Sequence, residues 1–472
     1  MAVPEPEAVW PLSGTTQPSP PAVVGVADLR ATNAAAVLAV VRSADAHPRL
    51  SGLVEATNLS RPTVEAITEE LTDCGLIEVA PALSARGQRS PGRPARRFRF
   101  RPHAGFVVGV DVRTTSVTVC LADLDGRSVA VQRKAVHADL TGAARARAVT
   151  ATVEAAMAHA EVDPARVWAA TVGTPGLVDR TNARVRQADN LRTWADTDIA
   201  GILRDLLHCP VAVENDANLA ALGEQWRGIG NASAVPTTTA GSIAADTAVI
   251  AGKGVSTAVG GDSIAVGGSD VAVDGAGEST EVETDGAGPN AAAEKSGVSF
   301  GEMVFVLLGE RLGAGIITGG RLLRGHHGAA GEIGFIRFPG SSGSTGSPGL
   351  EPLPSPVVAD AAKGQADAVA AVESYGRRLA EGIAPVLLAL DPALVVLGTG
   401  RFPLPDTSPA ADLLLNAARA HADTLLVDPP RWQLSALGDE AVLTGAVRFA
   451  LSPVEDMLRT RPMSLVARAP HG

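Results

Sequence analysis

The sequence predicts an α/β protein in which a small helical head at the N-terminus precedes a larger body with two lobes. Three observations support this prediction. Short helical segments with strong capping residues lie before residue 76. An arginine-rich strip that alternates with aromatic residues follows them. From residue 105 onward, apolar runs with strand periodicity alternate with helical segments, which is typical of α/β folds.

Length and composition indicate a folded protein of several domains. At roughly 100–200 residues per domain, 472 residues suffice for two to four domains, and 46% of them are apolar. Cys74, Cys120 and Cys209 are far apart and form no CxxC pair, which argues against a disulfide framework and a cysteine-rich zinc site. No basic, apolar leader opens the chain and no apolar run is long enough to span a membrane, so we expect a soluble cytoplasmic protein.

Charge is distributed unevenly along the chain. The net charge of −11 argues against a basic coat over the whole surface. Residues 1–101 carry 11 basic and 10 acidic side chains, whereas the rest carries 29 basic and 41 acidic side chains. Seven arginines form a local strip: Arg86, Arg89, Arg93, Arg96, Arg97, Arg99 and Arg101. Most such runs are solvated faces, and this one gains meaning from the helices that precede it.

The head, residues 27–101, has the pattern of a winged helix-turn-helix. Residues 1–26 are rich in Pro, Ser and Thr and are expected to be a disordered arm. Helices are expected at about 29–43 and 50–57. A third helix should begin after Ser60, a good N-cap, with Pro62 in its first turn.

Both ends of this third helix are marked in the sequence. Leu59 and Val64 occupy the two positions of a hydrophobic staple. Gly75 suits the left-handed C′ position, and Leu76 is placed to contact Leu71 in a Schellman motif. A strand at 76–79 and a returning strand that ends at Arg101 would form the wing.

In a helix-turn-helix, the start of the second helix of the motif enters the major groove. An arginine in a narrow wing segment, such as Arg93, can enter the minor groove. The expected DNA-binding residues are Ser60, Arg61, Thr63, Glu65 and Thr68, with the wing residues Arg89, Arg93, Arg96 and Arg97. The alternative is a three-helix packing module whose arginine loop is merely solvated.

The body is expected in two segments, 105–228 and 299–455. Strand patterns at 106–112, 116–124 and 128–136 precede a helix at about 143–161 and a strand at 167–172, an order that recurs in actin-like ATPase folds. Residues 229–298 are dominated by small residues and are expected to be a disordered insert. Residues 456–472 are expected to be a C-terminal tail.

Six short motifs in the body resemble the ROK family of repressors, open reading frames and sugar kinases. They are Asp111 with Thr114-Thr115, Val172-Gly173-Thr174-Pro175-Gly176-Leu177-Val178-Asp179, Glu214-Asn215-Asp216-Ala217-Asn218, Leu312-Gly313-Ala314-Gly315-Ile316-Ile317, Gly328-Ala329-Ala330-Gly331-Glu332-Ile333-Gly334 and Leu397-Gly398-Thr399-Gly400. The resemblance covers about residues 29–228 and 299–450. With the head, it is similar to the repressor branch, typified by regulators of xylose, glucose and N-acetylglucosamine genes. It implies a duplicated actin-like ATPase (ribonuclease H-like) sugar-kinase fold.

The resemblance also implies a sugar pocket. Asp216 matches the base that takes the proton from the attacking hydroxyl in the kinases. Asn215 and Glu332 match positions that hydrogen-bond sugar hydroxyls, and Gly176 would let the backbone approach the ring. Glu351 matches a further sugar-contacting glutamate. Taken alone, Asn215-Asp216 is equally well explained as a helix cap.

The chain departs from the kinase pattern at both phosphate loops. The family kinases have glycines where this chain has Arg113 and Thr114. Glycine lets backbone N–H groups approach a phosphate, whereas these side chains occupy the space. In the second loop, Glu310 adds a negative charge unless Arg311 neutralises it. The sequence therefore predicts no ATP binding, no enzyme activity and no cofactor.

The zinc motif that the family carries is also altered. Phe335 stands at the position of its histidine, and Ser342, Ser344 and Gly349 stand at those of its cysteines. Hydroxyl groups do not replace thiolates as zinc ligands. His326-His327 has no cysteine nearby and is expected at the surface or the pocket rim. No metal site is predicted.

Together these observations favour a DNA-binding transcriptional regulator, a repressor before an activator. It would bind double-stranded operator DNA, act as a homodimer or higher homo-oligomer and respond to a carbohydrate in the kinase-like cleft. Two alternatives stay open. One is an active sugar kinase with an accessory DNA-binding head, which Asp216 favours and the phosphate loops oppose. The other is a regulator that binds no ligand and whose body only dimerises.

Overall fold

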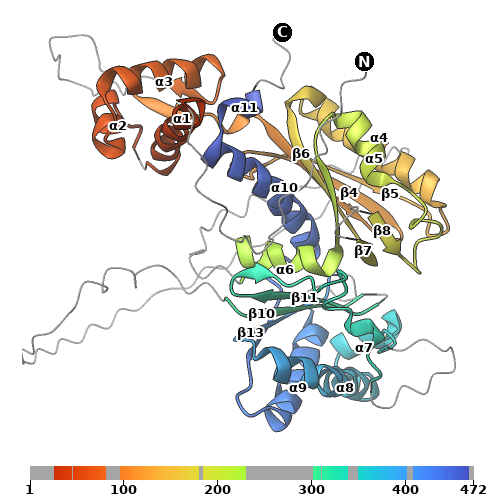
Figure 1. Ribbon diagram of the computed structural model, residues 1–472. Coiled ribbons are helices and arrows are strands. Elements are labelled where there is room, and N and C mark those ends of the chain that lie inside the picture. Colours follow the sequence, from red (N-terminus) through yellow and green to blue (C-terminus); the bar gives the residue numbers. More distant parts are fainter. Residues whose placement is uncertain are drawn as a thin grey trace, which may run out of the picture. The chain divides into compact units, whose positions relative to one another are not determined.

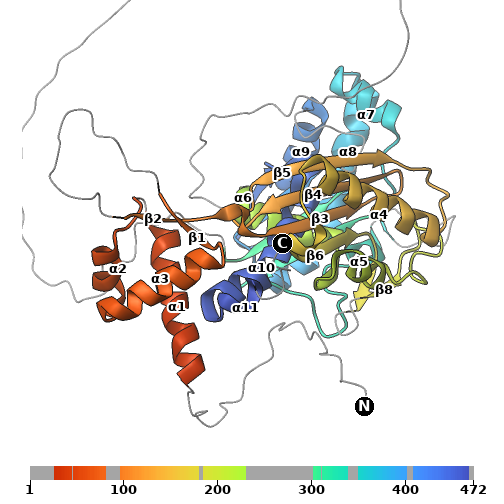
Figure 2. The same cartoon turned by 90° about the horizontal axis from the view of Figure 1, so that it is seen from above.

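The computed structural model describes residues 26–44, 46–80, 96–179, 184–229, 301–309, 311–338, 349–400 and 408–466 (Figures 1 and 2). All of the predicted arm (1–26) except Val26, which begins a helix, and nearly all of the predicted insert lie outside the described residues.

The head contains three helices and a short hairpin. The helices are α1 (Val26–Ser43), α2 (Leu50–Thr57) and α3 (Arg61–Asp73). Strands β1 (Ile77–Val79) and β2 (Phe98–Phe100) pair antiparallel, with Ile77 opposite Phe100. Apolar side chains from all five elements form one core. They are Val37, Leu38 and Val41 of α1, Leu53 of α2, Val64, Ile67 and Leu71 of α3, and Ile77 and Phe98 of the hairpin.

The signals that bound the third helix are confirmed. The Ser60 hydroxyl accepts the backbone N–H of Thr63 at 3.3 Å, and Pro62 lies in the first turn. At the other end, the Leu76 N–H donates to the Leu71 carbonyl at 3.0 Å, as a Schellman motif requires. Gly75 has φ +74°, a left-handed conformation that favours glycine. Helix α3 is therefore fixed in length and direction by local interactions.

The body contains two sheets of five strands with the same topology. The first has the order β5 (Ser128–Ala135), β4 (Ser116–Asp123), β3 (Phe106–Val112), β6 (Val167–Thr174), β9 (Val211–Asn215). The second has the order β12 (Arg321–Leu322), β11 (Gly313–Thr318), β10 (Met303–Leu307), β13 (Leu394–Gly398), β14 (Arg431–Leu434). In both, three antiparallel strands precede two parallel ones in chain order. The duplicated fold predicted from the sequence is confirmed.

Helices cover both faces of each sheet. On one face of the first sheet lie α4 (Gly142–His159) and α5 (Ile199–Leu207). The second sheet shares a core with α7 (Ser355–Ala362), α8 (Ala366–Leu390) and α9 (Pro409–Leu425). Between the sheets lie α6 (Asp216–Arg227), which contacts the second sheet, and α10 (Ala441–Thr460), which contacts the first (Figure 1). A small hairpin, β7 (Leu177–Asp179) and β8 (Arg184–Gln187), lies beside the first sheet.

The C-terminal segment corrects one prediction. Residues 456–466 were expected in a tail, but α10 continues to Thr460 and α11 (Met463–Val466) follows. Leu458 and Leu465 are buried in the same cluster as α1 of the head. The far end of α10 thus packs against α1, as Figure 2 also shows. No helix in the described part of the chain is long and apolar enough to cross a membrane.

We expect the Ser60→Ala substitution to lower the stability of the head. Removing the hydroxyl leaves the Thr63 N–H without its capping acceptor, which should cost about 1 kcal/mol of unfolding free energy. Urea unfolding followed by circular dichroism measures this change. The control is Ser51→Ala, at an exposed position inside α2. Equal stability losses in the two variants would contradict the assigned cap.

Candidate functional site

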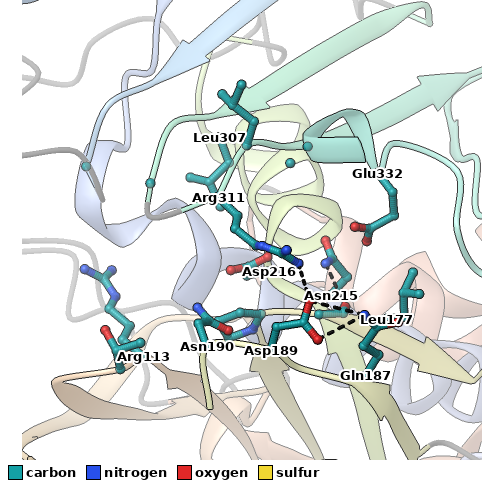
Figure 3. Close-up of a pocket in the computed structure, with 18 of the residues that line it drawn as sticks. Arg113, Leu177, Gln187, Asp189, Asn190, Asn215, Asp216, Leu307, Arg311 and Glu332 are labelled. Atoms are coloured by element: carbon teal, nitrogen blue, oxygen red, sulfur yellow. Dashed lines mark hydrogen bonds and ion pairs between the residues drawn. The ribbon is translucent and has the colours of Figure 1, made fainter. Parts of the chain in front are cut away.

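The candidate site is a cleft of about 260 Å³ between the two sheets of the body (Figure 3). Both sheets contribute to its walls, mainly through residues just beyond the ends of their strands. The polar side chains among them are Arg113, Thr114, Thr115, Ser116, Arg133, Gln187, Asp189, Asn190, Asn215, Asp216, Arg311 and Glu332. Ligands commonly bind at the strand ends of α/β sheets, where loops converge.

The junction of β9 and α6 supplies the central polar groups. Asn215 caps α6, because its Oδ1 accepts the N–H groups of Ala217 and Asn218 at 2.9 and 3.2 Å. Its Nδ2 donates to the Gly176 carbonyl at 3.0 Å. The helix cap and the ligand-facing residue are thus the same side chain. The structure brings Gly176, Asn215, Asp216 and Glu332 into one cleft, as the sequence predicted.

Two carboxylates, Asp216 and Glu332, face this cleft from different elements (Figure 3). Asp216 is 8% exposed and lies in the first turn of α6, and its Oδ1 accepts the Ala217 N–H at 2.8 Å. Burial, and secondly the charge of Asp216, raise the pKa of Glu332 to about 7, while Arg311 opposes the rise. The cleft therefore holds a hydrogen-bond acceptor beside a carboxyl group that is partly protonated near neutral pH.

Gly176 is required by its conformation. Its φ is +102°, and a Cβ atom there would overlap the Gln187 carbonyl. A glycine is therefore needed where the β6–β7 connection passes close to β8. This close approach places the Gly176 carbonyl at the cleft, where it holds Asn215.

Arg113 directly follows β3, in the loop that the resemblance aligns with the first phosphate loop of the kinases. Its Nε donates to Asp111 at 2.7 Å, and its Nη2 donates to the Asp439 carbonyl at 2.8 Å. It also pairs with the Asp439 carboxylate. These neighbours raise the pKa of Arg113 against the effect of its burial. Arg113 thus joins the end of β3 to the turn before α10.

A second buried arginine holds this loop in place. Arg145 of α4 is fully buried. Its guanidinium donates to the backbone carbonyls of Arg113, Thr114 and Ala138, the last two at 3.0 and 3.2 Å. The carbonyl groups of this loop therefore accept hydrogen bonds from the charged side chain of Arg145.

The opposite wall of the cleft is also crossed by an ion pair. Arg311 donates to Asp189 at 2.7 Å, and Gln187 donates to the same carboxylate at 3.0 Å (Figure 3). The Arg311 guanidinium lies 5.4 Å from the ring of Phe335. Phe335 lines the cleft and is 45% exposed, so it offers an apolar surface where the family histidine would be.

Several predicted residues are not brought to this cleft. Glu351 is exposed and does not line it, and its role as a sugar contact stays a prediction. His326 and His327 are exposed, with their rings stacked edge to face. Glu310, Ser342 and Ser344 lie outside the described residues.

In the head, most of the predicted DNA-binding residues of α3 are accessible. Ser60, Arg61 and Glu65 are exposed, Thr63 is half-buried, and Arg61 pairs with Glu65 at 3.0 Å. The prediction for Thr68 was wrong. Thr68 is 3% exposed, and its hydroxyl donates to the Glu65 carbonyl inside the helix.

The wing is described only in part. Arg89 and Arg93 lie outside the described residues. Arg96 is exposed, whereas Arg97 is half-buried and donates to the His47 carbonyl at 2.8 Å. Arg97 therefore also links the wing to the segment before α2.

Sequence reasoning missed the charged residues that close the cleft. Asp189 follows β8 and Asp439 lies in the 3-10 turn before α10, neither in a recognisable motif, and Arg113 is separated from Asp439 by 326 positions. Only the replaced glycines gave a signal, and that signal pointed to lost phosphate binding, without showing what fills the space.

Known proteins that are similar to this chain include two xylose repressors and a glucokinase. The ROK family model matches residues 107–260. The xylose repressor of Caldicellulosiruptor bescii is 23% identical over 180 residues, which are 38% of this chain and 43% of the repressor. The xylose repressor of Bacillus subtilis is 26% identical over 37% of this chain and 43% of its own length. The glucokinase of Streptomyces coelicolor is 25% identical over 49% of this chain and 50% of its own. The chain thus matches half or less of the length of these relatives.

Among solved structures, a ROK family transcriptional regulator, described as a homologue of the E. coli MLC protein, has a similar fold. The TM-score is 0.58 at 17% identity, and the match covers 93% of this chain and 100% of that chain. This similarity extends over the head as well as the body, and it supports the fold assigned to both.

We expect Glu332 to make stability depend on pH. Because the pKa of Glu332 is raised from 4.5 to about 7, the folded protein holds this proton to a higher pH than the unfolded chain does. The contribution of this proton to the free energy of unfolding is complete below about pH 4.5 and is lost as the pH rises through about 7. Thermal midpoints measured across this window should fall more for the wild type than for Glu332→Gln. Parallel curves for the two proteins would show that the raised pKa is wrong.

Proposed function

The chain belongs to the ROK family, and we propose that it is a DNA-binding transcriptional regulator without kinase activity. It would act as a repressor that binds operator DNA through α3 and the wing, and that responds to a monosaccharide in the cleft. The observation that carries the proposal is the combination of a complete helix-turn-helix head with a sugar-kinase cleft in which Arg113 occupies the first phosphate loop.

The head supports DNA binding by its geometry. The N-terminus of α3 is exposed and carries Arg61, and its direction is fixed by the Ser60 cap and the Schellman motif. An exposed helix N-terminus of this kind suits the major groove. Two heads in a homodimer would bind two half-sites, as helix-turn-helix proteins commonly do.

The cleft supports a neutral carbohydrate as the effector. Asn215, Asp216 and Glu332 offer amide and carboxyl groups at one end, which are the partners that sugar hydroxyls need. Phe335 adds an apolar face. Relatives are named xylose repressor and glucokinase, so D-xylose and D-glucose are the first sugars to test.

The phosphate side of the cleft argues against phosphoryl transfer. In a kinase, backbone N–H groups and a metal ion neutralise the nucleotide phosphates. Here the Arg113 guanidinium is already paired with Asp111 and Asp439, and the loop carbonyls are held by Arg145. A nucleotide would have to break these interactions before it could bind.

The test is a mobility-shift experiment with the DNA upstream of the chain's own gene and its neighbours, with and without a panel of sugars. A specific shift that one sugar releases supports the regulator. A specific shift that no sugar changes would support a body that only dimerises. If no specific shift occurs at moderate salt, where nonspecific contacts weaken, the head assignment is wrong and a kinase assay follows.

We expect Arg61→Ala to weaken operator binding roughly tenfold or more, because a base or phosphate contact is lost at about 1–3 kcal/mol. Fluorescence anisotropy with labelled operator measures the affinity. Arg377→Ala is the control, since Arg377 forms a similar exposed pair with Glu373 on α8 of the body. If Arg61→Ala binds the operator as tightly as the wild type does, α3 is not part of the DNA interface.

We expect Asp216→Asn to abolish the sugar response while operator affinity stays within about twofold, because the change removes the charge that polarises a sugar hydroxyl. The measurement is the sugar concentration that halves operator binding. Asp412→Asn is the control, because Asp412 also lies in the first turn of a helix but is exposed. An unchanged response in Asp216→Asn would place the effector elsewhere. Loss of ATP-dependent sugar phosphorylation in this variant would instead identify a kinase.

A further inference from the structure

Arg324 lies at the base of the loop that carries Glu332. It follows β12 of the second sheet and is 7% exposed. The backbone carbonyl of Arg324 accepts the Ala330 N–H at 3.2 Å, which closes the loop just before Glu332. A ligand that pulls on Glu332 therefore acts on a segment whose other end is Arg324.

The Arg324 guanidinium forms a buried ion pair with Glu214 of β9. Both side chains are less than one-tenth exposed. Glu214 also accepts the Asn215 N–H and the Asn218 side-chain amide, each at 2.9 Å. Arg324 thus joins the Glu332 loop of the second sheet to Glu214 of the first sheet, which positions Asn215. A buried pair of this kind needs good geometry, since its charges have lost their hydration.

Arg324 also contacts the helix that leads to the head. Its Cζ atom lies 4.8 Å from the centre of the Phe449 ring, in the middle of α10. An arginine over an aromatic ring is held by a cation–π interaction, which is stronger when the pair is partly desolvated. Beyond this contact, α10 continues to the core that it shares with α1.

Helix α10 is also packed tightly against α6. A Cβ atom at Gly445 of α10 would overlap the Leu219 carbonyl of α6. The two backbones therefore touch, and the pair behaves as one body because packed cores deform little. The α6 backbone meets the second sheet just as closely, since a Cβ atom at Gly315 of β11 would overlap the Ala217 carbonyl. The Glu332 loop meets this packed unit through side-chain contacts, among them those of Arg324 with Glu214 and Phe449.

We propose that Arg324 is a positioning residue that transmits ligand occupancy of the cleft to the head. It does so by coupling the Glu332 loop, through Glu214 and Phe449, to α10. The inference rests on the proposed function and deepens it, because it names the contact through which the effector would change DNA binding. A ligand changes DNA affinity only through different affinities for two arrangements. Here the arrangements differ in how Arg324 meets the Phe449 ring.

The test removes the aromatic ring of Phe449 and leaves the residues that line the cleft unchanged. In Phe449→Leu the cation–π contact is lost, while the buried pair of Arg324 with Glu214 remains. D-Xylose or D-glucose should bind the free protein with unchanged affinity by calorimetry, and operator affinity without sugar should stay within about twofold. The factor by which sugar changes operator affinity should fall by about fivefold or more, the lower end of usual allosteric couplings.

Two further variants separate coupling from folding. Phe449→Tyr retains the aromatic face on a half-buried side chain and should restore the coupling. Arg448→Gln, at the neighbouring position, removes an ion pair with Glu455 on the same helix and should leave the coupling unchanged. If Phe449→Leu does not fold, Arg324→Lys is measured instead. It keeps the charge beside Glu214 but loses the planar stacking, and it should reduce coupling without weakening sugar binding.

The outcomes distinguish this inference from the proposed function. If neither sugar binds wild-type protein or changes its operator affinity, the proposed effector is wrong and this inference falls with it. If the wild type responds and Phe449→Leu responds equally, the proposed function stands and Arg324 is not the coupling residue. If Arg448→Gln loses coupling as much as Phe449→Leu does, the effect belongs to α10 in general, and the specific role of Arg324 is overturned.

Discussion

The contact of α6 with α10 is the constraint on which the body depends. Each helix follows one sheet in the chain but packs toward the other, so the pair ties the two halves of the duplicated fold together. The approach is possible because Gly445 has no side chain where the Leu219 carbonyl passes. The N-terminus of α6 carries Asn215 and Asp216, and the C-terminal half of α10 packs against the head. One helix pair therefore contacts the cleft at one end and the head at the other.

Internal charge pairs connect the walls of the cleft. Arg113 with Asp439 on one side and Arg311 with Asp189 on the other each connect residues that follow different sheets. Both pairs are at least partly exposed, so each contributes little to stability on its own. Their effect is on geometry, because they hold the walls in register without any ligand.

Much of the head could be predicted from sequence because its signals are local. Cap, staple and Schellman motif each involve residues within a few positions. The error at Thr68 came from counting early residues of α3 as exposed. Thr68 is four residues after Val64, which places it on the buried stripe. The supposed tail was helical for a similar reason, since Leu458 continues the apolar side of α10.

Only those residues of the candidate site that belong to short sequence motifs were predicted. Asn215 and Asp216 were found because a strand end and a helix start adjoin in the chain. Asp439, Asp189 and Arg324 act through partners more than a hundred positions away, and no short pattern marks such pairs. Glu351 is exposed and does not line the cleft, so its sugar contact stays a prediction. An aligned position implies a contact only if the backbone between the motif and the cleft follows the same path.

A sugar-kinase scaffold suits regulation for a physical reason. Kinases bind sugar and nucleotide between two lobes, and closure of the lobes excludes water from the reacting groups. If Arg113 blocks nucleotide binding, as we propose, the energy of sugar binding has no chemical step to drive. It can still favour one arrangement of the Glu332 loop and its contacts over another. Because α10 begins two residues after Asp439, the partner of Arg113, and ends in the core that it shares with α1, that preference can reach the head through a single helix. The fold then needs no new element to become a switch, only a helix long enough to join the two sites.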